Sequence, residues 1–518
     1  MFSPLPADSP SPGHPRARAD GSLGFAPYGS SSNTWPADTP QFLDDGSSPS
    51  AAWRFDEFAQ DPGYIAYQEE LRDLIFHTAT NAAPTRDITP VSSPSPDSGA
   101  AADEGVTAGT AEASAVSTGA AAAGNAPLDP SAQHDLHRQT AAVLSQGRRF
   151  EYLKIYVGQV APWLDMFDSG GRAFAIQLPV LARTSPALLY ALLALSARQR
   201  ERREGRRHSS FDSLELYQEA IRLLTPLLQA RDPLSVPICT ILCVMEMMSA
   251  SARDWRKHLE GCAALFDAFG VHGFSGGLFQ AVFWCYARMD VCGALISDGT
   301  QGTLVPPAKW LAPGADETRA RELFRAAESP DAHANYAVYL CAKVCWLTAD
   351  RTRFVELGET NGCDSEVFAV RWQGLWDDLQ VWLDERPPEM LPAQTLETRP
   401  FPQILFAHWA AISSSQLYHT ACILLLNMMP RSVPAPEGLA GSATWHARRV
   451  CGISLTNPHE GCLNNAVQPL WVAGKLLSHR SEHALVVKLI RNIEAMTGWA
   501  ASWRIADLEA AWGYRAYR

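Results

Sequence analysis

The sequence predicts an all-α protein that is preceded by a long disordered N-terminal region. From about His137 onward, apolar residues recur at intervals of three and four, which places them on one face of a helix. Alternating runs of Val, Ile and Thr bounded by turn residues, which would indicate strands, do not occur. With 518 residues, the chain is long enough to bury the cores of two or three domains.

The N-terminal region comprises residues 1–135 and is rich in Ser, Pro, Gly, Ala and Asp. Such a composition cannot bury enough apolar surface to offset the entropy lost on ordering, so we expect disorder. One short amphipathic helix is expected near residues 64–77. Its apolar face would carry Tyr64, Tyr67, Leu71, Leu74 and Ile75. Two interpretations stay open: docking on the folded body, which is the simpler one, or an acidic, aromatic activation-type motif that folds on a partner.

The helical body comprises residues 136–518. The periodicity is clearest over residues 212–231, where large apolar residues line one face. The spacing predicts about ten to fifteen packed helices in all. The individual helices are expected over residues 150–167, 186–203, 212–231, 236–249, 254–269, 279–296, 333–348, 365–384, 402–428, 464–478 and 482–496.

Charge and cysteine usage indicate the class of protein and its compartment. The formal net charge of -12 makes the chain a poor non-specific binder of DNA. The first residues, MFSPLPADSPSPGH, lack the basic and apolar regions of a secretory signal. All eleven cysteines lie at or after Cys239, most of them singly among apolar residues, as reduced and buried thiols do. We therefore expect a cytosolic or nuclear protein.

One uncharged stretch is long enough to be considered as a membrane span. No Asp, Glu, Lys or Arg lies between Arg399 and Arg431, and a spanning helix needs about 20 apolar residues. The stretch nevertheless contains groups that are costly in hydrocarbon, namely His408, Ser413, Ser414, Ser415, Gln416, His419 and Asn427. We expect a helix buried in protein and no membrane partner.

The sequence contains the residue pattern of a serine hydrolase motif. Residues 273–277 (GFSGG) fit G-x-S-x-G, in which the serine must lie on a tight turn between a strand and a helix. The preceding segment is helical, so the motif is expected in a link between two helices. Hydrolysis by Ser275 is kept only as a third hypothesis.

The sequence also contains the residue pattern of a zinc protease motif. His479, Glu482 and His483 fit H-x-x-E-H, in which two histidines one turn apart hold the metal. Ser481 is expected to be the N-cap residue of the following helix. This would place His479 outside the helix and away from His483.

Two cysteine pairs share a helical face, Cys239 with Cys243 and Cys341 with Cys345. Neither pair has nearby Cys or His residues to complete four ligands, so we expect core thiols. Phosphate-cradling glycine loops are absent from the sequence. Five tryptophans and one leucine at helical spacing are expected to be buried in the core: Trp255, Leu259, Trp284, Trp376, Trp382 and Trp499. We therefore predict no catalytic, cofactor-binding, metal-binding or DNA-binding residue.

One strongly basic run, RQRERREGRRH, contains Arg198, Arg200, Arg202, Arg203, Arg206 and Arg207. Such a run can contact phosphates or act as an import signal. It follows an apolar helix, so a solvated helix end with cations near the negative end of the helix dipole is expected instead.

Several stretches between Phe150 and Tyr514 are similar to stretches that occur in the same order in one protein family. They are FEYLKIYVGQVAPWLDMFD, SPALLYALLALSARQ, DWRKHLEGCAALF, FWCYARMDVCGALI, WDDLQVWLDERPPEMLP, SSSQLYHTACILLL, ARRVCGISLTN, VQPLWVAGKLLS and EAMTGWAASWRIADLEAAWGY. Together they resemble the regulatory domain of fungal zinc-binuclear-cluster (Zn2Cys6) transcription factors, in particular the acriflavine-sensitivity control type. The segment ELRDLIFHTATNAAPTRDITP resembles the linker of that type.

The resemblance implies that residues 136–518 are an all-helical regulatory domain of the middle homology type, in a nuclear protein that responds to effectors. It also implies a zinc cluster in which six cysteine thiolates hold two Zn²⁺ and place a helix in the DNA major groove. No Cys precedes Cys239, so these ligands match no position of this sequence. We expect that cluster upstream of Met1, with zinc and DNA contact only there.

The predicted function is that of a fungal transcriptional regulator, without catalysis. Its expected partners are the transcription machinery or other regulators, a small-molecule effector and a second copy in a homodimer. The alternative is a helical protein-interaction scaffold or cofactor that makes no contact with DNA.

Overall fold

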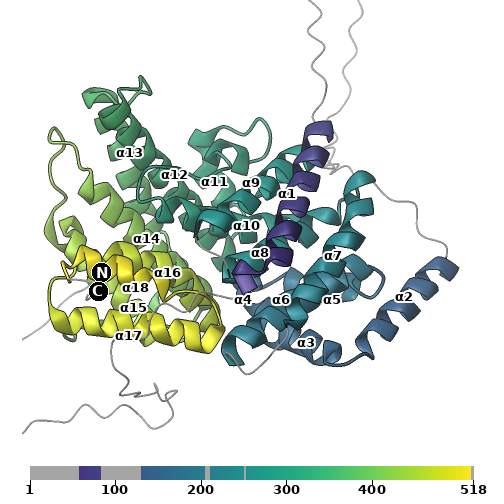
Figure 1. Ribbon diagram of the computed structural model, residues 1–518. Helices are drawn as coiled ribbons and strands as arrows, with labels where there is room; N and C mark the ends of the chain where they lie inside the picture. The colour runs from purple at the N-terminus through teal and green to yellow at the C-terminus, as the bar shows by residue number, and fades with distance from the viewer. Residues whose placement is uncertain (1–57, 83–129, 205–210, 250–251, 515–518) are drawn as a thin grey trace, which may run out of the picture. The chain divides into compact units, whose positions relative to one another are not determined.

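The fold is described from a computed structural model, which describes residues 58–82, 130–204, 211–249 and 252–514 (Figure 1). Most of the N-terminal region that was expected to be disordered lies outside the described residues. Within them the prediction of an all-α fold is confirmed. Helix α13 has the predicted bounds, Ser365–Asp384, and helices α6 to α10 begin and end within two residues of the expected positions.

The helices of the N-terminal half are α1 (Pro62–Ala82), α2 (Pro130–Leu144), α3 (Arg149–Ile155), α4 (Ala161–Leu164), α5 (Leu178–Leu181), α6 (Pro186–Glu204), α7 (Asp212–Gln229), α8 (Ser235–Ser249), α9 (Ala252–Phe269) and α10 (Gly277–Ile296). Those of the C-terminal half are α11 (Ala320–Arg325), α12 (Pro330–Leu357), α13 (Ser365–Asp384), α14 (Trp409–Asn427), α15 (Ala443–Thr456), α16 (Glu460–Gly474), α17 (Arg480–Thr497) and α18 (Trp503–Ala511). Two π-helices, η2 (Tyr156–Val160) and η4 (Ala173–Gln177), flank α4.

The expected helix over residues 402–428 is wrong in its first turns. A two-stranded antiparallel hairpin, β1 (Pro392–Leu396) and β2 (Gln403–Phe406), precedes α14. The side chain of Asn457, after α15, accepts a hydrogen bond from the Phe406 backbone N–H at 3.0 Å and donates one to the Ile404 carbonyl at 2.7 Å. These contacts satisfy backbone groups of the strand that a helix would have satisfied internally.

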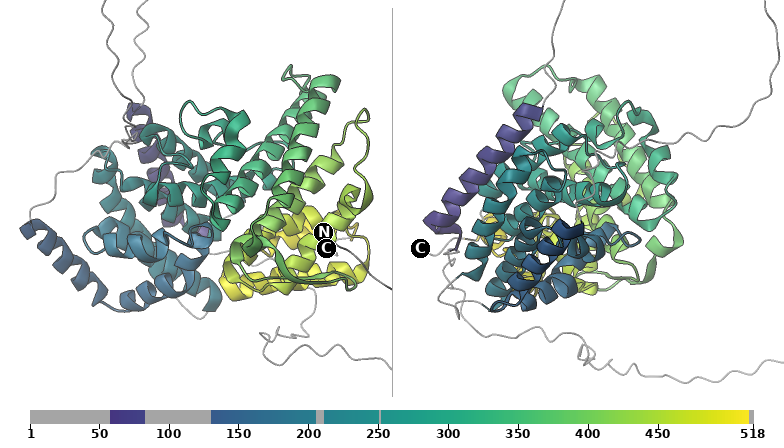
Figure 2. Two further views of the ribbon diagram at one scale, coloured as in Figure 1. Left: turned by 180° about the vertical axis from the view of Figure 1, so that it is seen from behind. Right: turned by 90° about the vertical axis from the view of Figure 1, so that its right-hand side faces the viewer.

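The N-terminal helices pack around α6, which contacts α3, α7 and α8, while α8 also contacts α9. Helix α1 lies on the outside of this group along α7 and α9 (Figure 2). Its side chains Tyr64, Leu71 and Ile75 are buried in the contact. In the structure this amphipathic helix is therefore docked on the folded body, which is the simpler of the two interpretations.

Helix α10 joins the two halves, because it contacts α8 and α9 on one side and α12 and α16 on the other. In the C-terminal half, α14 packs against α12, α15 and α16, and α16 packs against α17. Helix α14 is buried around its whole circumference, including Ser413, Ser414 and Gln416. The uncharged stretch is therefore a buried helix, as expected. In the part of the chain that the structure describes, no helix is long and apolar enough to cross a membrane.

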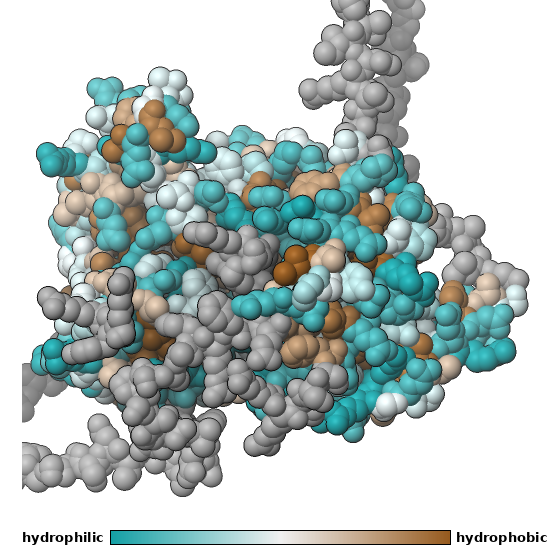
Figure 3. All heavy atoms as spheres, viewed as in Figure 1, coloured by the Kyte–Doolittle hydropathy of each residue, from teal (hydrophilic) through white to brown (hydrophobic). Residues whose placement is uncertain are grey.

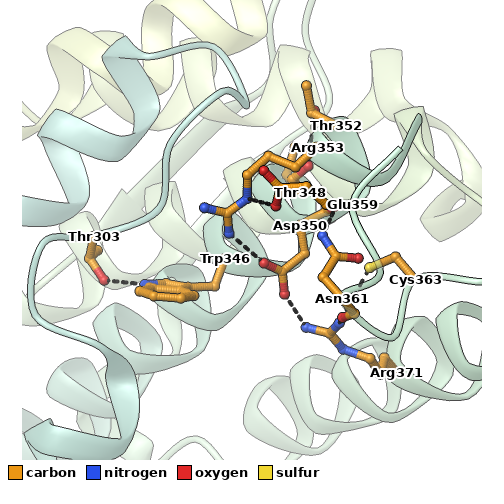
Figure 4. A network of polar contacts seen from close by, with 10 residues as sticks. All are labelled: Thr303, Trp346, Thr348, Asp350, Thr352, Arg353, Glu359, Asn361, Cys363 and Arg371. Carbon is orange, nitrogen blue, oxygen red and sulfur yellow. Dashed lines mark hydrogen bonds and ion pairs between the residues drawn. The ribbon is translucent and has the colours of Figure 1, made fainter. Parts of the chain in front are cut away.

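A network of ion pairs fixes the turn between α12 and α13 (Figure 4). The Asp350 carboxylate lies 2.7 Å from Arg353 Nη2 and 2.7 Å from Arg371 Nη2, so one acid joins the two helices. The Asn361 side chain donates to the Asp350 carbonyl at 2.7 Å. Figure 3 shows hydrophobic residues among the hydrophilic ones on this face of the molecule. The adjoining ends of α12 and α13 expose four apolar side chains: Val355, Leu357, Val367 and Val370.

Replacement of Asp350 by Asn is expected to destabilise the α12–α13 turn. It removes the charge shared by Arg353 and Arg371, both of which are partly exposed, so we expect a loss of about 1–2 kcal/mol in the free energy of unfolding. Urea denaturation measures this loss. The exposed Asp377, replaced by Asn, is the control and should cost less than about 0.5 kcal/mol; equal losses would contradict the assignment.

Candidate functional site

The serine of the G-x-S-x-G motif lies in the link between α9 and α10, as expected. The Ser275 hydroxyl accepts a hydrogen bond from the His272 backbone N–H at 2.8 Å, and the His272 ring accepts one from the Phe274 backbone N–H at 3.2 Å. The imidazole is therefore engaged with the turn and not with the serine hydroxyl. Ser275 is a turn residue in this arrangement.

The H-x-x-E-H residues form a helix cap. His479, and not Ser481 as expected, is the N-cap residue of α17, and Glu482 completes a capping box with it. Glu482 also pairs with Arg448 at 2.9 Å, and His483 stacks on Trp512 with ring centres 3.9 Å apart. Within the described ranges, no group of three or more His, Cys, Asp or Glu could hold a metal ion.

The basic run at the end of α6 differs from the expected solvated helix end. Arg198 is only 2% exposed, and its guanidinium lies 4.0 Å from the centre of the Phe58 ring. Arg200 pairs with Glu204 and Glu151, and Arg202 pairs with Glu494. These arginines hold α6 to its neighbours, while Arg206 and Arg207 lie outside the described residues.

The expected core anchors Leu259, Trp284, Trp376 and Trp382 are buried. The side chain of Trp255 is outside the described part of the chain. Trp499 is only partly buried and, instead of filling the core, lines a cavity. The paired cysteines Cys239, Cys243, Cys341 and Cys345 are buried free thiols.

This cavity is the candidate functional site. It lies where α4, α8, α10 and α16 meet the segment before α18, and the space between the atoms amounts to about 770 Å³, which includes its open mouth. Its walls are mostly apolar and aromatic, with a few polar groups, as in pockets for small molecules. The residues that line it are Trp163, Leu164, Val244, Met247, Cys285, Arg288, Met289, Cys292, Ile296, Asn464, Asn465, Val467, Gln468, Trp499, Ala500 and Trp503.

Arg288 is a buried cation in the wall of the cavity. Its side chain is 6% exposed, donates one hydrogen bond to the Leu164 carbonyl at 2.8 Å and lies 5.0 Å over the Phe167 ring. Burial lowers the pKa of this guanidinium below its ordinary value. Within the described residues no carboxylate forms an ion pair with it. A charge buried with so few partners is costly unless something else pairs with it.

Asn464 supplies a second unusual polar group. It is 9% exposed, and neither its amide nitrogen nor its amide oxygen has a hydrogen-bond partner among the residues that the structure describes. Buried polar atoms are almost always bonded, and leaving one unbonded costs about 1–3 kcal/mol. The amide lines the cavity, so a bound molecule could satisfy it. The neighbouring Asn465 is different, because it donates to the Gly461 carbonyl at 2.9 Å.

Arg504 holds two of the residues that line the cavity, Gln468 and Trp503. Its guanidinium lies between the rings of Trp471 and Trp503, at 4.6 and 4.3 Å from their centres. It also donates two hydrogen bonds to the Gln468 carboxamide oxygen, at 3.0 and 2.8 Å. The Gln468 oxygen and the Trp503 ring are thereby fixed before any ligand binds.

The two thiols in the cavity are poorly suited to chemistry. Burial raises the pKa of Cys285 to about 11 and that of Cys292 to about 12. Near neutral pH both remain protonated, and the thiolate is the form that attacks electrophiles or binds metals. The two protonated thiols therefore contribute polarisable, apolar surface to the wall of the cavity.

The irregular segment around α4 positions Trp163 and Leu164. Asp165, directly after them, accepts hydrogen bonds from the backbone N–H groups of Phe174 at 2.8 Å and Ala175 at 2.7 Å. The carboxylate thereby satisfies the first amides of π-helix η4. Burial nevertheless raises the pKa of Asp165 to about 6.

Asp165 is expected to make stability depend on pH. Its pKa is higher in the folded than in the unfolded chain, so its contribution is full below about pH 4 and is lost as the pH rises through about 6. The loss is about 2–3 kcal/mol in wild type and should be missing from Asp165→Asn, so that the difference between the two proteins changes with pH in urea denaturation at pH 4 to 7. The control Asp377→Asn should leave the pH profile unchanged; a profile equal for all three proteins would contradict the assignment.

A second cavity lies between α9 and the segment after α10, with about 1070 Å³ of space that is largely open. At its edge Lys309 Nζ lies 2.7 Å from Asp267. Both side chains are exposed and paired with each other, so the charges at this edge are already neutralised.

The described residues form an all-helical domain that contains this cavity, and comparison with known proteins gives its family. Residues 151–512 match the fungal specific transcription factor domain. The chain belongs to this family. Every residue that lines the first cavity lies inside the matched range.

One curated protein is similar to this chain, the transcription activator AMTR1 of Alternaria alternata. The two are 25% identical over 334 residues, which is 53% of this chain and 43% of the relative. The match thus spans less than half the length of that activator. No solved structure matches the chain.

Proposed function

We propose that this chain is the effector-sensing body of a nuclear transcription activator. The observation that carries the proposal is the unbonded amide of Asn464 in the wall of a cavity within the family domain. A regulator that responds to a small molecule needs a cavity whose polar groups are better satisfied with the molecule than without it. We propose activation, and not repression, because the similar Alternaria protein is named a transcription activator.

The body acts by binding and not by catalysis. Ser275 is held by the turn that contains it, and the histidine beside it is bonded to a backbone amide. The cavity thiols have raised pKa values because they are buried, which makes them poor nucleophiles. Replacement of Ser275 by Ala should therefore leave every regulatory property unchanged.

The partners proposed are the transcription machinery and, through a zinc cluster that is not among these 518 residues, DNA. The sequence has no six-cysteine cluster and carries a net charge of -12, both of which argue against base readout by this chain. Homodimerisation stays a prediction. A protein-interaction scaffold is the second candidate, and the exposed apolar end formed by Val355, Leu357, Val367 and Val370 favours it.

A tethering experiment separates the two candidates. The 518-residue chain is fused to an unrelated DNA-binding domain in a fungal host, and transcription of a reporter with the matching operator is measured. An activator raises the reporter signal, and Asn464→Leu changes its dependence on growth conditions while Ser275→Ala does not. A signal at the level of the DNA-binding domain alone would favour the scaffold. Specific binding of the unfused chain to duplex DNA at physiological salt would contradict the proposed route to DNA.

A further inference from the structure

We infer that the molecule bound in this cavity is an amphipathic carboxylate: an apolar, preferably aromatic, small molecule with one carboxylate that pairs with Arg288. The inference rests on the proposed effector-sensing function and names the chemical class of the effector. It is carried by four features of the cavity: an unpaired buried cation, an unbonded amide, a wall of indole rings, and the small number of free donors.

The cation requires an anion. The acids that act on Arg288 from a distance, Asp165 and Asp168, are both engaged with backbone amides at the start of η4. Neither of them forms an ion pair with the guanidinium among the described residues. A ligand carboxylate would supply the missing partner, and a charge-assisted hydrogen bond is about twice as strong as a neutral one.

The amide of Asn464 lies on the α16 side of the same cavity. Its nitrogen can donate to a carboxylate oxygen, and its oxygen can accept from a hydroxyl or N–H group on the same ligand. Both atoms are unbonded in the protein alone, so the two contacts replace nothing. The amide therefore adds orientation to the charge of Arg288.

The body of the ligand meets aromatic and thioether groups. Trp163, Trp499 and Trp503 line the cavity together with Met247 and Met289. Indole rings bind flat apolar groups over a large area, and methionine adapts to irregular ones.

The number of donors separates a carboxylate from a phosphate. Arg288 is the one Lys or Arg in the cavity wall, and part of its donor capacity is used on the Leu164 carbonyl. A phosphate dianion carries more charge and more acceptors than one guanidinium and one amide can satisfy. A single carboxylate matches this pair of donors.

The test uses three acids, naphthoate, indole acetate and octanoate, with their neutral amides as probes of the same shape. Binding to the full 518-residue chain is measured by calorimetry. We expect at least one acid to bind about tenfold or more tightly than its amide, and Arg288→Met to abolish that preference. Arg222, which is exposed and pairs with Glu219 on α7, provides the matched control: Arg222→Met should keep the preference.

A stability measurement tests the same inference without any ligand. If Arg288 and Asn464 serve a ligand, Arg288→Met and Asn464→Leu should keep or raise the urea midpoint of the free protein, because each removes an unsatisfied buried group. A clear fall in the midpoint for both variants would show structural roles and overturn the inference.

The outcomes distinguish the ligand class from the proposed function. If the amides bind as tightly as the acids and Asn464→Leu weakens both, the carboxylate class is wrong and the sensing function stands. If none of the acids binds up to its solubility limit, the class is also overturned. The proposed function fails separately, when the tethered chain gives no reporter signal.

Discussion

Replacement of His258 by Leu is expected to cost about 3–5 kcal/mol of the free energy of unfolding. His258 Nδ1, on α9, lies 2.8 Å from the Oε2 atom of Glu246 on α8, whose side chain is 0% exposed. The Tyr217 hydroxyl, on α7, donates to the other carboxylate oxygen. Without His258, the carboxylate of Glu246 keeps only half of its partners in a place that water does not reach.

The measurement is urea denaturation of the variant at neutral pH. The double variant His258→Leu with Glu246→Met should recover most of the loss, because a buried pair can be replaced by apolar groups although half of it cannot be removed. His134, which is exposed on α2, is the control, and His134→Leu should change the free energy of unfolding by less than about 0.5 kcal/mol. A loss below about 1 kcal/mol for His258→Leu would show that the carboxylate finds another partner.

Replacement of Gly261 by Leu is expected to release α1 from the body. A Cβ atom at Gly261 on α9 would lie 3.1 Å from Cγ2 of Ile75, so the helices approach too closely for any larger side chain. Leu cannot be accommodated unless α1 moves, which exposes Tyr64 and Leu71 as well as Ile75. Hydrogen exchange over residues 64–78 should become about 100-fold faster or more.

Two further variants test this contact. Gly374 lies on the exposed side of α13, where an added Cβ has no atom within 4 Å, so Gly374→Leu is the matched control and should leave exchange in α1 unchanged. Gly261→Leu combined with Ile75→Ala should restore protection in part, because the smaller residue returns space to the contact. If exchange in α1 stayed slow in Gly261→Leu alone, the contact with α9 would not be what holds the helix.

The helices that sequence alone placed well are those whose ends and faces are determined locally. Helix α13 begins where Asp364 accepts hydrogen bonds from the backbone N–H groups of Glu366 and Val367. Its Trp372 and Trp376 are one turn apart and stack with ring centres 5.5 Å apart. The N-cap residue and the helical spacing of the apolar residues can both be recognised within about twenty residues of sequence.

The hairpin and the cavity depend on contacts between distant segments. Strand β2 is an apolar run that reads as the start of α14, and Asn457, some fifty residues later, satisfies its backbone. The cavity likewise combines side chains from residues 163 to 503, so no local pattern marks it. The one signal that could have pointed to it is the Asn464–Asn465 pair inside the otherwise apolar helix α16. Two adjacent amides in a buried helix need partners, and only Asn465 finds one within the protein.

Trp163 and Leu164 reach the cavity because α3 continues through the π-helix η2 into α4. A π-helical turn corresponds to one residue more than an α-helix would contain. Deletion of Gly158, where an added Cβ would meet nothing within 4 Å, would allow the segment to return to α-helical winding. Because the π-helical turn already absorbs that extra residue, the residues after η2 would keep nearly the same direction around the helix axis. The cavity wall is thus a matter of helical phase: if the same residues wound as a continuous α-helix, the segment after η2 would be turned by about 100° around the helix axis and Trp163 would point away from the site.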